Sequence, residues 1–360
     1  MSRFQLVVIF CIILTVVLSC SKKTTEPVLE VEIPYFSPPG GDYYSTQNVE
    51  IICATEEVDI FFTSDGSDPD ETSIVYSGPI EISTNVLLKA RAYKSGWEAS
   101  GIASAIYVIK VLIPENMMFV DGGTFNPTAT YSVTINSIYI GIYPVIQADY
   151  QSVMGRNPSW FNNDPNNPVE TVSWFDAIEY CNRLSLLEGL TPCYSYTDYG
   201  NDPVNWPENW NSDWQNHLNV SCDWSASGYR LPTEMEWMFA AKGGIFSESF
   251  IYSGSNNIDE VAWYWNNSGG ITHPVGLKAG NELEIFDMSG NVWEWCWDIY
   301  SPYPTGSFAD PSGADNGMYR IKRGGSAYSS SMSCTVYYRH RHTATSMGKY
   351  NGFRVCRRVP

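Results

Sequence analysis

Residues 287–298 read DMSGNVWEWCWD, a polar start that runs into three tryptophans separated by single residues. Further segments stand around it in the chain: MMFVDGGTF at 117–125, GYRLPTEMEW at 228–237, and RGGS at 323–326 with GFRV at 352–355. The sequence between them is rich in Gly, Asn, Ser, Trp and Tyr and forms long connections. Compact domains rarely carry such connections unless the loops are functional. We therefore expect the function of this region to lie on irregular loops.

Two helices are predicted within this region, each from a capping signal. The first begins at the pattern Ser173-x-x-Asp176, continues through apolar residues at helical spacing and ends at Gly189. The second is shorter, begins at the tetrapeptide 233–236 and ends at Gly243.

Taken together, these segments resemble the formylglycine-generating enzyme family, also called the sulfatase-modifying-factor domain. The resemblance covers residues 114–360 and implies a variant of the C-type lectin fold. That fold is mixed α+β and mostly irregular, with two helices and a twisted antiparallel sheet. Because one fold hosts several functions, the chemistry has to be argued from the residues of the site.

The resemblance also locates the positions that match the copper site of the family. Catalytic members of the family convert a sulfatase cysteine to formylglycine with copper(I) and oxygen, and they hold the metal by two cysteines just after the RGGS motif. Here Cys334 fills the second position, but Ser329 stands at the first. Copper(I) favours thiolate ligands, and a hydroxyl is a hard, weakly basic one. Trp293 and Ser326 match other active-site positions, yet we expect no catalytic residues and no copper.

A structural calcium ion is a further expectation that the resemblance implies. In the family, one calcium is held by the side chains that match Asp287 and Glu294 and by the backbone carbonyls that match Gly290 and Val292. Oxygen ligands of this kind suit calcium. The alternative is an ordinary turn that begins with an aspartate and leaves the glutamate facing water.

Residues 327–350 have the composition of a binding surface, in which rigid tyrosines alternate with small, adaptable Ser and Thr. The residues predicted to bind a ligand are Tyr328, Tyr337, Tyr338, His340, His342 and Tyr350. The two histidines could share one face of a strand and hold a metal, but no acidic residue or cysteine lies nearby in sequence, so solvent-facing loop residues are preferred. The predicted function is therefore non-catalytic binding of a protein or glycan ligand. The alternatives are an active formylglycine-generating oxidase, a structural role in the envelope, and, for the tyrosines, plain outer-face residues.

The preceding region, 34–110, consists of short alternating strands broken by turns, which is the pattern of an all-β sandwich. Its segments SPPGG at 37–41 and LKARAYKSGW at 88–97 resemble the immunoglobulin-like sandwich found at the C-terminal end of chitobiases. The resemblance implies a spacer domain between a tether at 20–33 and the domain at 114–360.

The N-terminus has the features of an export signal. Arg3 precedes an apolar run at 6–18 that is short for a transmembrane helix. The run ends at Ser19-Cys20, which resembles the lipobox of bacterial lipoproteins. We therefore expect residues 1–19 to be a signal peptide, Cys20 to be lipidated, and the protein to be anchored in the membrane of a bacterial cell envelope.

Seven of the nine cysteines follow the export signal, so an odd number is left and at least one thiol is free. Cys193 and Cys222 flank two short strand-like runs, and they are the predicted disulfide.

Composition bounds the remaining classes of function. A chain of 360 residues favours two domains. The 39 acidic residues outnumber the 21 lysines and arginines, which gives a net charge of -18. Such a surface repels polyanions, so we expect no nucleic-acid partner.

Overall fold

The computed structural model describes residues 29–43, 46–109 and 114–360. The predicted signal segment and the lipidation site at Cys20 lie outside the described residues. Within the described ranges, no helix is both long and apolar enough to cross a membrane. The chain divides into two compact units, Met1–Leu112 and Ile113–Pro360, and each is described by itself.

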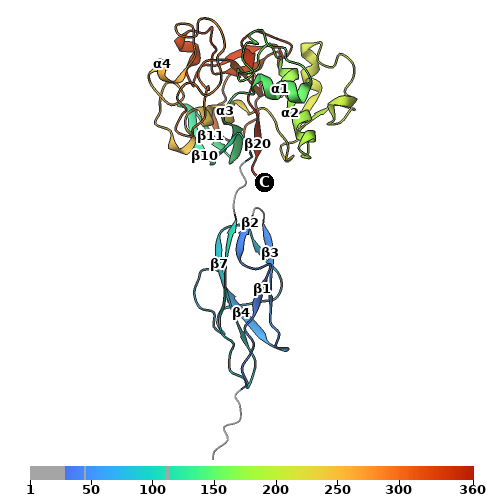
Figure 1. Cartoon of the computed structure of the whole chain (residues 1–360), viewed down its shortest axis with the longest axis vertical. Helices are drawn as coiled ribbons and strands as arrows, with labels where there is room; N and C mark the ends of the chain where they lie inside the picture. The colour runs from blue at the N-terminus through green and yellow to red at the C-terminus, as the bar shows by residue number, and fades with distance from the viewer. Residues whose placement is uncertain (1–28, 44–45, 110–113) are drawn as a thin grey trace, which may run out of the picture. The chain divides into compact units, whose positions relative to one another are not determined.

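The described part of the first unit is all β, as predicted, with strands that run along its length (Figure 1). A three-stranded sheet has the order β1-β3-β6, and a five-stranded sheet has the order β2-β8-β7-β4-β5. In β7, Leu88, Ala90 and Ala92 are fully buried while the residues between them are partly exposed. This alternation with a period of two puts one face of the strand in the core. The strands are β1 Tyr35–Ser37, β2 Gly41–Tyr43, β3 Gln47–Ile52, β4 Asp59–Thr63, β5 Ile74–Val75, β6 Ile80–Ile82, β7 Val86–Tyr93 and β8 Ala103–Ile109.

The second unit is mixed α+β with long irregular connections, which confirms the predicted fold class. Its sheets have the orders β20-β12-β9, β10-β11-β16, β13-β14 and β18-β17-β15-β19. The strands are β9 Met117–Val120, β10 Gly123–Thr128, β11 Tyr131–Ile135, β12 Ile138–Gly141, β13 Tyr194–Tyr196, β14 Val220–Cys222, β15 Trp293–Ile299, β16 Gly306–Ala309, β17 Arg320–Arg323, β18 His340–His342, β19 Asn351–Gly352 and β20 Cys356–Arg358. The α-helices are α1 Gln147–Met154, α2 Trp174–Leu187, α3 Glu234–Ala241 and α4 Ile258–Val261. Short 3-10 turns cover Pro203–Asn205, Trp214–Asn219, Gly244–Phe246 and Ser331–Cys334.

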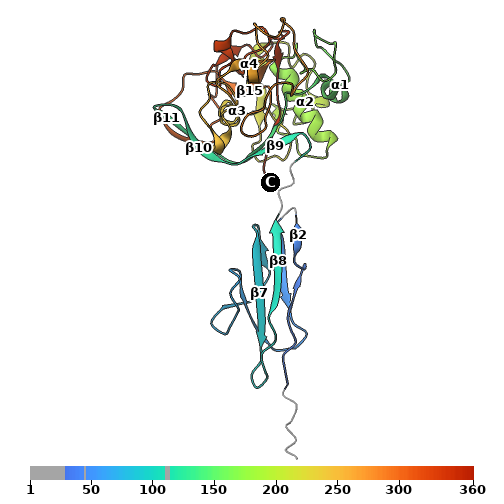
Figure 2. The same cartoon turned by 60° about the vertical axis from the view of Figure 1, so that its left-hand side comes forward.

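Helices α2 and α3 begin at the predicted caps. The Ser173 hydroxyl accepts a hydrogen bond from the Asp176 backbone N–H, and the Asp176 carboxylate accepts one from the Ser173 N–H. Thr233 and Glu236 form the same reciprocal pair at α3. Helix α1 packs beside α2 (Figure 2) and is not predicted by the sequence. Its N-cap, Ile146, has no side chain that could cap a helix, so the usual signal is absent.

The predicted disulfide between Cys193 and Cys222 is wrong, because both cysteines are free in the structure. Strands β13 and β14 do pair, but the register places Tyr194 opposite Cys222. Cys193 is therefore one residue out of register, and a one-residue offset directs its side chain to the other face. The Cys193 thiol instead donates a hydrogen bond to the Gly228 carbonyl, 3.3 Å away.

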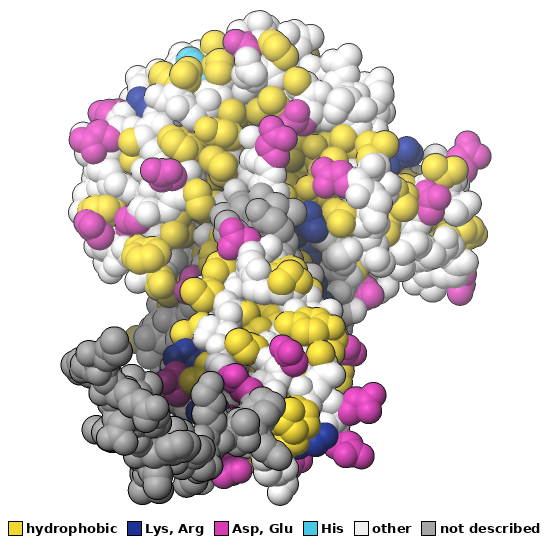
Figure 3. Space-filling model, turned by 60° about the horizontal axis from the view of Figure 1, so that its bottom comes forward, with side chains coloured by type: hydrophobic (Ala, Val, Ile, Leu, Met, Phe, Trp, Pro, Cys, Tyr) yellow, Lys and Arg dark blue, Asp and Glu magenta, His cyan; other side chains and the backbone are white. Residues whose placement is uncertain are grey.

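Acidic side chains are spread widely over the face that Figure 3 shows, and few basic side chains lie between them. This distribution agrees with the excess of acidic residues in the sequence.

A buried ion pair joins β15 to the C-terminal end of the second unit. The Glu294 and Arg354 side chains are both fully buried. Arg354 donates to both carboxylate oxygens of Glu294, from Nε at 2.6 Å and from Nη2 at 2.7 Å. The Trp237 indole N–H on α3 donates to the same carboxylate at 2.6 Å. Remaining guanidinium protons bind the Gly141 and Phe286 carbonyls, so one side chain connects four parts of the unit.

Replacing Arg354→Met is expected to lower the free energy of unfolding by about 3–5 kcal/mol, because it leaves the Glu294 carboxylate charged and unpaired in the core. Removing the partly exposed helical pair with Arg183→Met, which frees Glu179, is expected to cost less, about 1 kcal/mol. Urea unfolding of both variants measures the difference. Equal losses would show that the buried pair has no special role.

Candidate functional site

The residues that match the copper site do not fit copper(I). Cys334 is fully buried at the end of a 3-10 turn, and burial raises the pKa of its thiol to about 12. Ser329 stands at the other position, and its hydroxyl lies 2.9 Å from the Ser326 hydroxyl. The Ser329 hydroxyl also accepts a hydrogen bond from the Ser326 backbone N–H at 3.0 Å. The site therefore offers a single cysteine beside two mutually bonded hydroxyls, which is a poor donor set for copper(I), an ion that favours thiolate ligands.

The calcium ligands are already bound by protein donors. Both oxygens of Glu294 accept hydrogen bonds from Arg354. Asp287 is buried, and its oxygens accept from the Gly276 N–H at 2.8 Å and the Asn291 amide at 3.1 Å. Burial raises the pKa of the Asp287 carboxyl, because the charged form is disfavoured away from water.

A guanidinium within 2.7 Å of both Glu294 oxygens would repel a divalent cation. The backbone carbonyls of Gly290 and Val292 could contribute only neutral ligands beside it. In the described ranges no three His, Cys, Asp or Glu side chains are grouped so that they could hold a metal. Calcium at these residues stays a prediction, and these contacts do not support it.

From this geometry we expect the melting temperature to be the same in excess EDTA and in millimolar calcium, because a ligand stabilises a protein only when it binds the native state. Differential scanning fluorimetry with metal analysis of the purified protein measures this. A melting temperature that falls in EDTA and returns with calcium would restore the calcium assignment.

Two of the predicted binding tyrosines lie together and are extended by residues from other loops. The Tyr328 and Tyr350 rings stack with centroids 5.4 Å apart and an interplanar angle of 10°. Trp265 packs edge-on against Tyr328 at 4.3 Å, and Phe161 packs against Tyr350 at 5.5 Å. Trp160 directly precedes Phe161 in the chain. We call Trp265, Tyr328, Tyr350, Phe161 and Trp160 the aromatic row.

Three of the five rings in the aromatic row are exposed, the other two are partly exposed, and Lys349 lies beside them. Trp160, Tyr328 and Trp265 are 70%, 54% and 53% exposed. The Lys349 ammonium lies 5.5 Å from the Tyr350 ring centroid and 5.9 Å from that of Trp160. The Tyr350 hydroxyl donates to the Gly270 carbonyl at 2.7 Å, which fixes the ring. The aromatic row is therefore an amphipathic surface whose Tyr350 ring is fixed by a hydrogen bond and which carries one positive charge, that of Lys349.

The other predicted binding residues make their contacts elsewhere. Tyr337 receives a hydrogen bond at its hydroxyl from the Lys242 ammonium, 2.7 Å away. Tyr338 and His340 pack against Trp293, with ring centroids 6.0 and 4.9 Å apart.

The predicted loop at His340 and His342 is wrong, because both residues belong to strand β18, which pairs with β17. His340 is half-buried, and burial together with the nearby Lys322 charge lowers its pKa to about 4. His342 is exposed, as expected. Neutral His340 thus serves as a packing partner of Trp293 rather than as a charged group.

Sequence reasoning missed Trp160, Phe161 and Trp265. None of the three lies in a motif, and the segments that carry them are far apart in the chain. Only the fold brings these segments to Tyr328 and Tyr350, so the sequence contains no local signal for the row.

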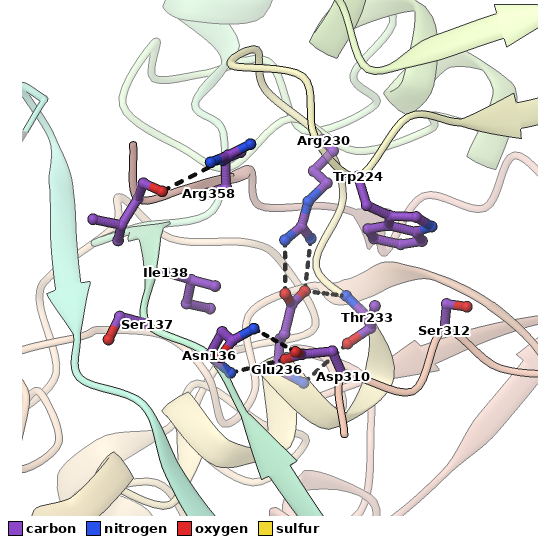
Figure 4. Close-up of a pocket in the computed structure, with 11 residues that line it drawn as sticks. Asn136, Ser137, Ile138, Trp224, Arg230, Thr233, Glu236, Asp310, Ser312 and Arg358 are labelled. Atoms are coloured by element: carbon purple, nitrogen blue, oxygen red, sulfur yellow. Dashed lines mark hydrogen bonds and ion pairs between the residues drawn. The ribbon is translucent and has the colours of Figure 1, made fainter. Parts of the chain in front are cut away.

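A separate concavity of about 490 Å³ lies where the GYRLPTEMEW segment meets β12 (Figure 4). Its floor is the buried pair of Arg230 and Glu236, whose groups lie 2.7 Å apart. On its rim, Asp310 accepts hydrogen bonds from the Asn136 backbone and side-chain amides. The Arg230–Glu236 ion pair and the Asn136–Asp310 hydrogen bonds hold neighbouring segments together, so these side chains have a structural role.

Comparison with known proteins gives two family matches. Residues 110–359 match the sulfatase-modifying factor enzyme 1-like domain, and residues 38–104 match the chitobiase/beta-hexosaminidase C-terminal domain. These matches confirm the resemblances that the sequence motifs indicate.

The chain is also similar to individual proteins and solved structures. The chain is 41% identical over 266 residues to the chaperone protein LppX of Paenibacillus barcinonensis, which covers 68% of this chain and 90% of that protein. It is 32% identical over 221 residues to the formylglycine-generating enzyme of Streptomyces coelicolor, covering 55% of this chain and 56% of the enzyme. Among solved structures, the Treponema denticola variable protein 1 superposes with a TM-score of 0.62 at 32% identity, over 74% of this chain and 98% of that one.

Proposed function

Because the chain belongs to the family of sulfatase-modifying factor enzyme 1-like domains, we propose that its second unit is a non-catalytic member that binds a protein or glycan ligand through the aromatic row. The observation that carries this proposal is that four aromatic rings from four chain segments pack together at the surface, with the exposed Trp160 linked to them by Lys349. Aromatic rings supply large contact area at low entropic cost, which is why they dominate many interfaces.

The order of the row supports a binding role. The stacking of Tyr328 on Tyr350 and the hydrogen bond to Gly270 hold the rings in place before a partner arrives. A surface that is already ordered loses less side-chain freedom on binding, and this raises affinity. The relative that is named a chaperone protein favours a protein over a glycan as the ligand.

The alternative function, oxidation of a sulfatase cysteine, requires chemistry that the residues present do not supply. Ser329 stands where the catalytic members have one of their two cysteines, and Cys334 alone supplies a single sulfur ligand. A hydroxyl bonded to Ser326 is a poor ligand for a soft metal ion. The proposal therefore assigns the second unit to binding alone.

The proposal places the protein in a bacterial cell envelope, anchored by a lipid at Cys20, with the β-sandwich unit as a spacer. The apolar run at 6–18, the Ser19-Cys20 pair and the polar tether support this location.

Labelled palmitate is expected to enter the wild-type protein and not the Cys20→Ser variant, measured in cells that export it. Equal labelling of the two proteins would contradict the anchor.

Truncating the row with Tyr328→Ala or Trp265→Ala is expected to weaken partner binding about thirtyfold, the usual effect of losing a central aromatic anchor. The melting temperature should change little, because both side chains are more than half exposed. The matched control is Tyr199→Ala, which removes a 46% exposed tyrosine outside the row. Affinity is measured by biolayer interferometry with the partner captured from an envelope extract.

Equal weakening by Tyr328→Ala and Tyr199→Ala would contradict a specific binding role for the row. So would a large loss of stability in the Tyr328 and Trp265 variants without any loss of affinity in the folded fraction. That second outcome would mean that the rings are structural.

A further inference from the structure

A different cavity of the second unit, about 430 Å³ in volume, is lined by tyrosines and carboxylates. Its acidic side chains are Glu115, Asp149 and Glu188, and its tyrosines are Tyr143, Tyr180 and Tyr229. Among the described residues, no lysine, arginine or histidine lines it. Cavities of this size commonly hold small ligands or single side chains of a partner.

Tyr180 is a buried polar side chain without a partner. It is 3% exposed, its ring stacks on Tyr150 at 5.6 Å and 4°, and Phe353 packs edge-on against it at 5.3 Å. Both contacts use the ring, and within the described part of the chain no hydrogen bond is made by its hydroxyl. Buried hydroxyls are nearly always hydrogen-bonded. The free phenol oxygen on the cavity wall is therefore a position at which a ligand can bind.

Among the described residues, Asp149 is the second side chain of this cavity without a protein partner. In the described ranges its carboxylate forms neither an ion pair nor a hydrogen bond, and burial raises its pKa. Burial raises the pKa of the Tyr180 phenol, and the Asp149 charge on the wall of the same cavity raises it further. Asp149 is exposed, so a cation that enters the cavity can reach its carboxylate and favours the charged form.

The surroundings keep the cavity negative. The Tyr229 hydroxyl donates to Glu188 at 2.8 Å, which leaves the Glu188 charge in place. Arg357 lies close to one wall of the cavity. Its guanidinium is 5.1 Å from the Tyr229 ring centroid and donates a hydrogen bond to the Ser227 carbonyl. Arg357 is thus held at the Tyr229 ring and does not line the cavity.

We propose that this cavity binds an alkylammonium group, the side chain of a lysine in a peptide. An ammonium group has three donors and no acceptor, which matches the Asp149 carboxylate, the Tyr180 phenol oxygen and Glu188. The apolar side chains of Val145 and Leu184 on the same wall suit the methylene stem. A metal ion fits less well, since no three metal-ligating side chains are grouped in the described residues.

The test is an isothermal titration of the purified chain with N-acetyl-lysine amide and, as the matched uncharged probe, N-acetyl-norleucine amide. The lysine amide is expected to bind at least about tenfold more tightly, and Asp149→Asn to weaken it about tenfold, because a hydrogen bond to a charged group is lost. Tyr180→Phe removes only the hydroxyl, keeps the ring contacts, and is expected to weaken binding about threefold.

Glu179→Gln is the control variant, since it removes a negative charge next to Tyr180 from a residue that pairs with Arg183 and does not line the cavity. It should leave the affinity unchanged. Equal affinity for the two amides, or equal weakening by Asp149→Asn and Glu179→Gln, would overturn the proposal. If Tyr180→Phe lowers the melting temperature, the Asp149→Asn result still decides, because Asp149 is exposed at the surface and has no packing role.

Discussion

The interaction on which the second unit depends is the buried pair of Glu294 and Arg354. A charge in a dry interior is tolerated only when it is paired and hydrogen-bonded. Here the two charges pair with each other, Glu294 also accepts a hydrogen bond from Trp237, and Arg354 also donates one to the Gly141 carbonyl. Glu294 lies on β15 and pairs in register with Gly352 of β19. Arg354 follows that strand by two residues. The pair therefore fixes the C-terminal segment against the centre of the unit.

The aromatic row depends on this attachment. Tyr350 directly precedes β19, and its carbonyl accepts a hydrogen bond from the Trp293 backbone N–H at the start of β15. Its ring position is consequently set by the same strand pairing that the ion pair holds in place. Tyr328, Phe161 and Trp265 come from loops and pack on or beside Tyr350. The core around this ion pair thus carries a surface that is built from irregular segments.

The sequence predicted those parts of the structure that have local signals. Capping boxes at Ser173 and Thr233 defined α2 and α3, and the four motif segments defined the fold class. It did not predict the register that separates Cys193 from Cys222, nor the row residues Trp160 and Trp265, because both follow from long-range packing. Tyr328 and Tyr350 were found from composition, which marks exposed aromatic side chains but does not say which of them meet.

Hydrogen–deuterium exchange of the protein with its captured partner tests the central claim, that this fold binds through the aromatic row, most directly. The account predicts slower exchange in the peptides that contain residues 160–161, 265, 328 and 349–350 together, although these lie far apart in the chain. Peptides around Tyr199 should exchange as they do without the partner. Protection confined to other segments, with the four row peptides unchanged, would contradict the account.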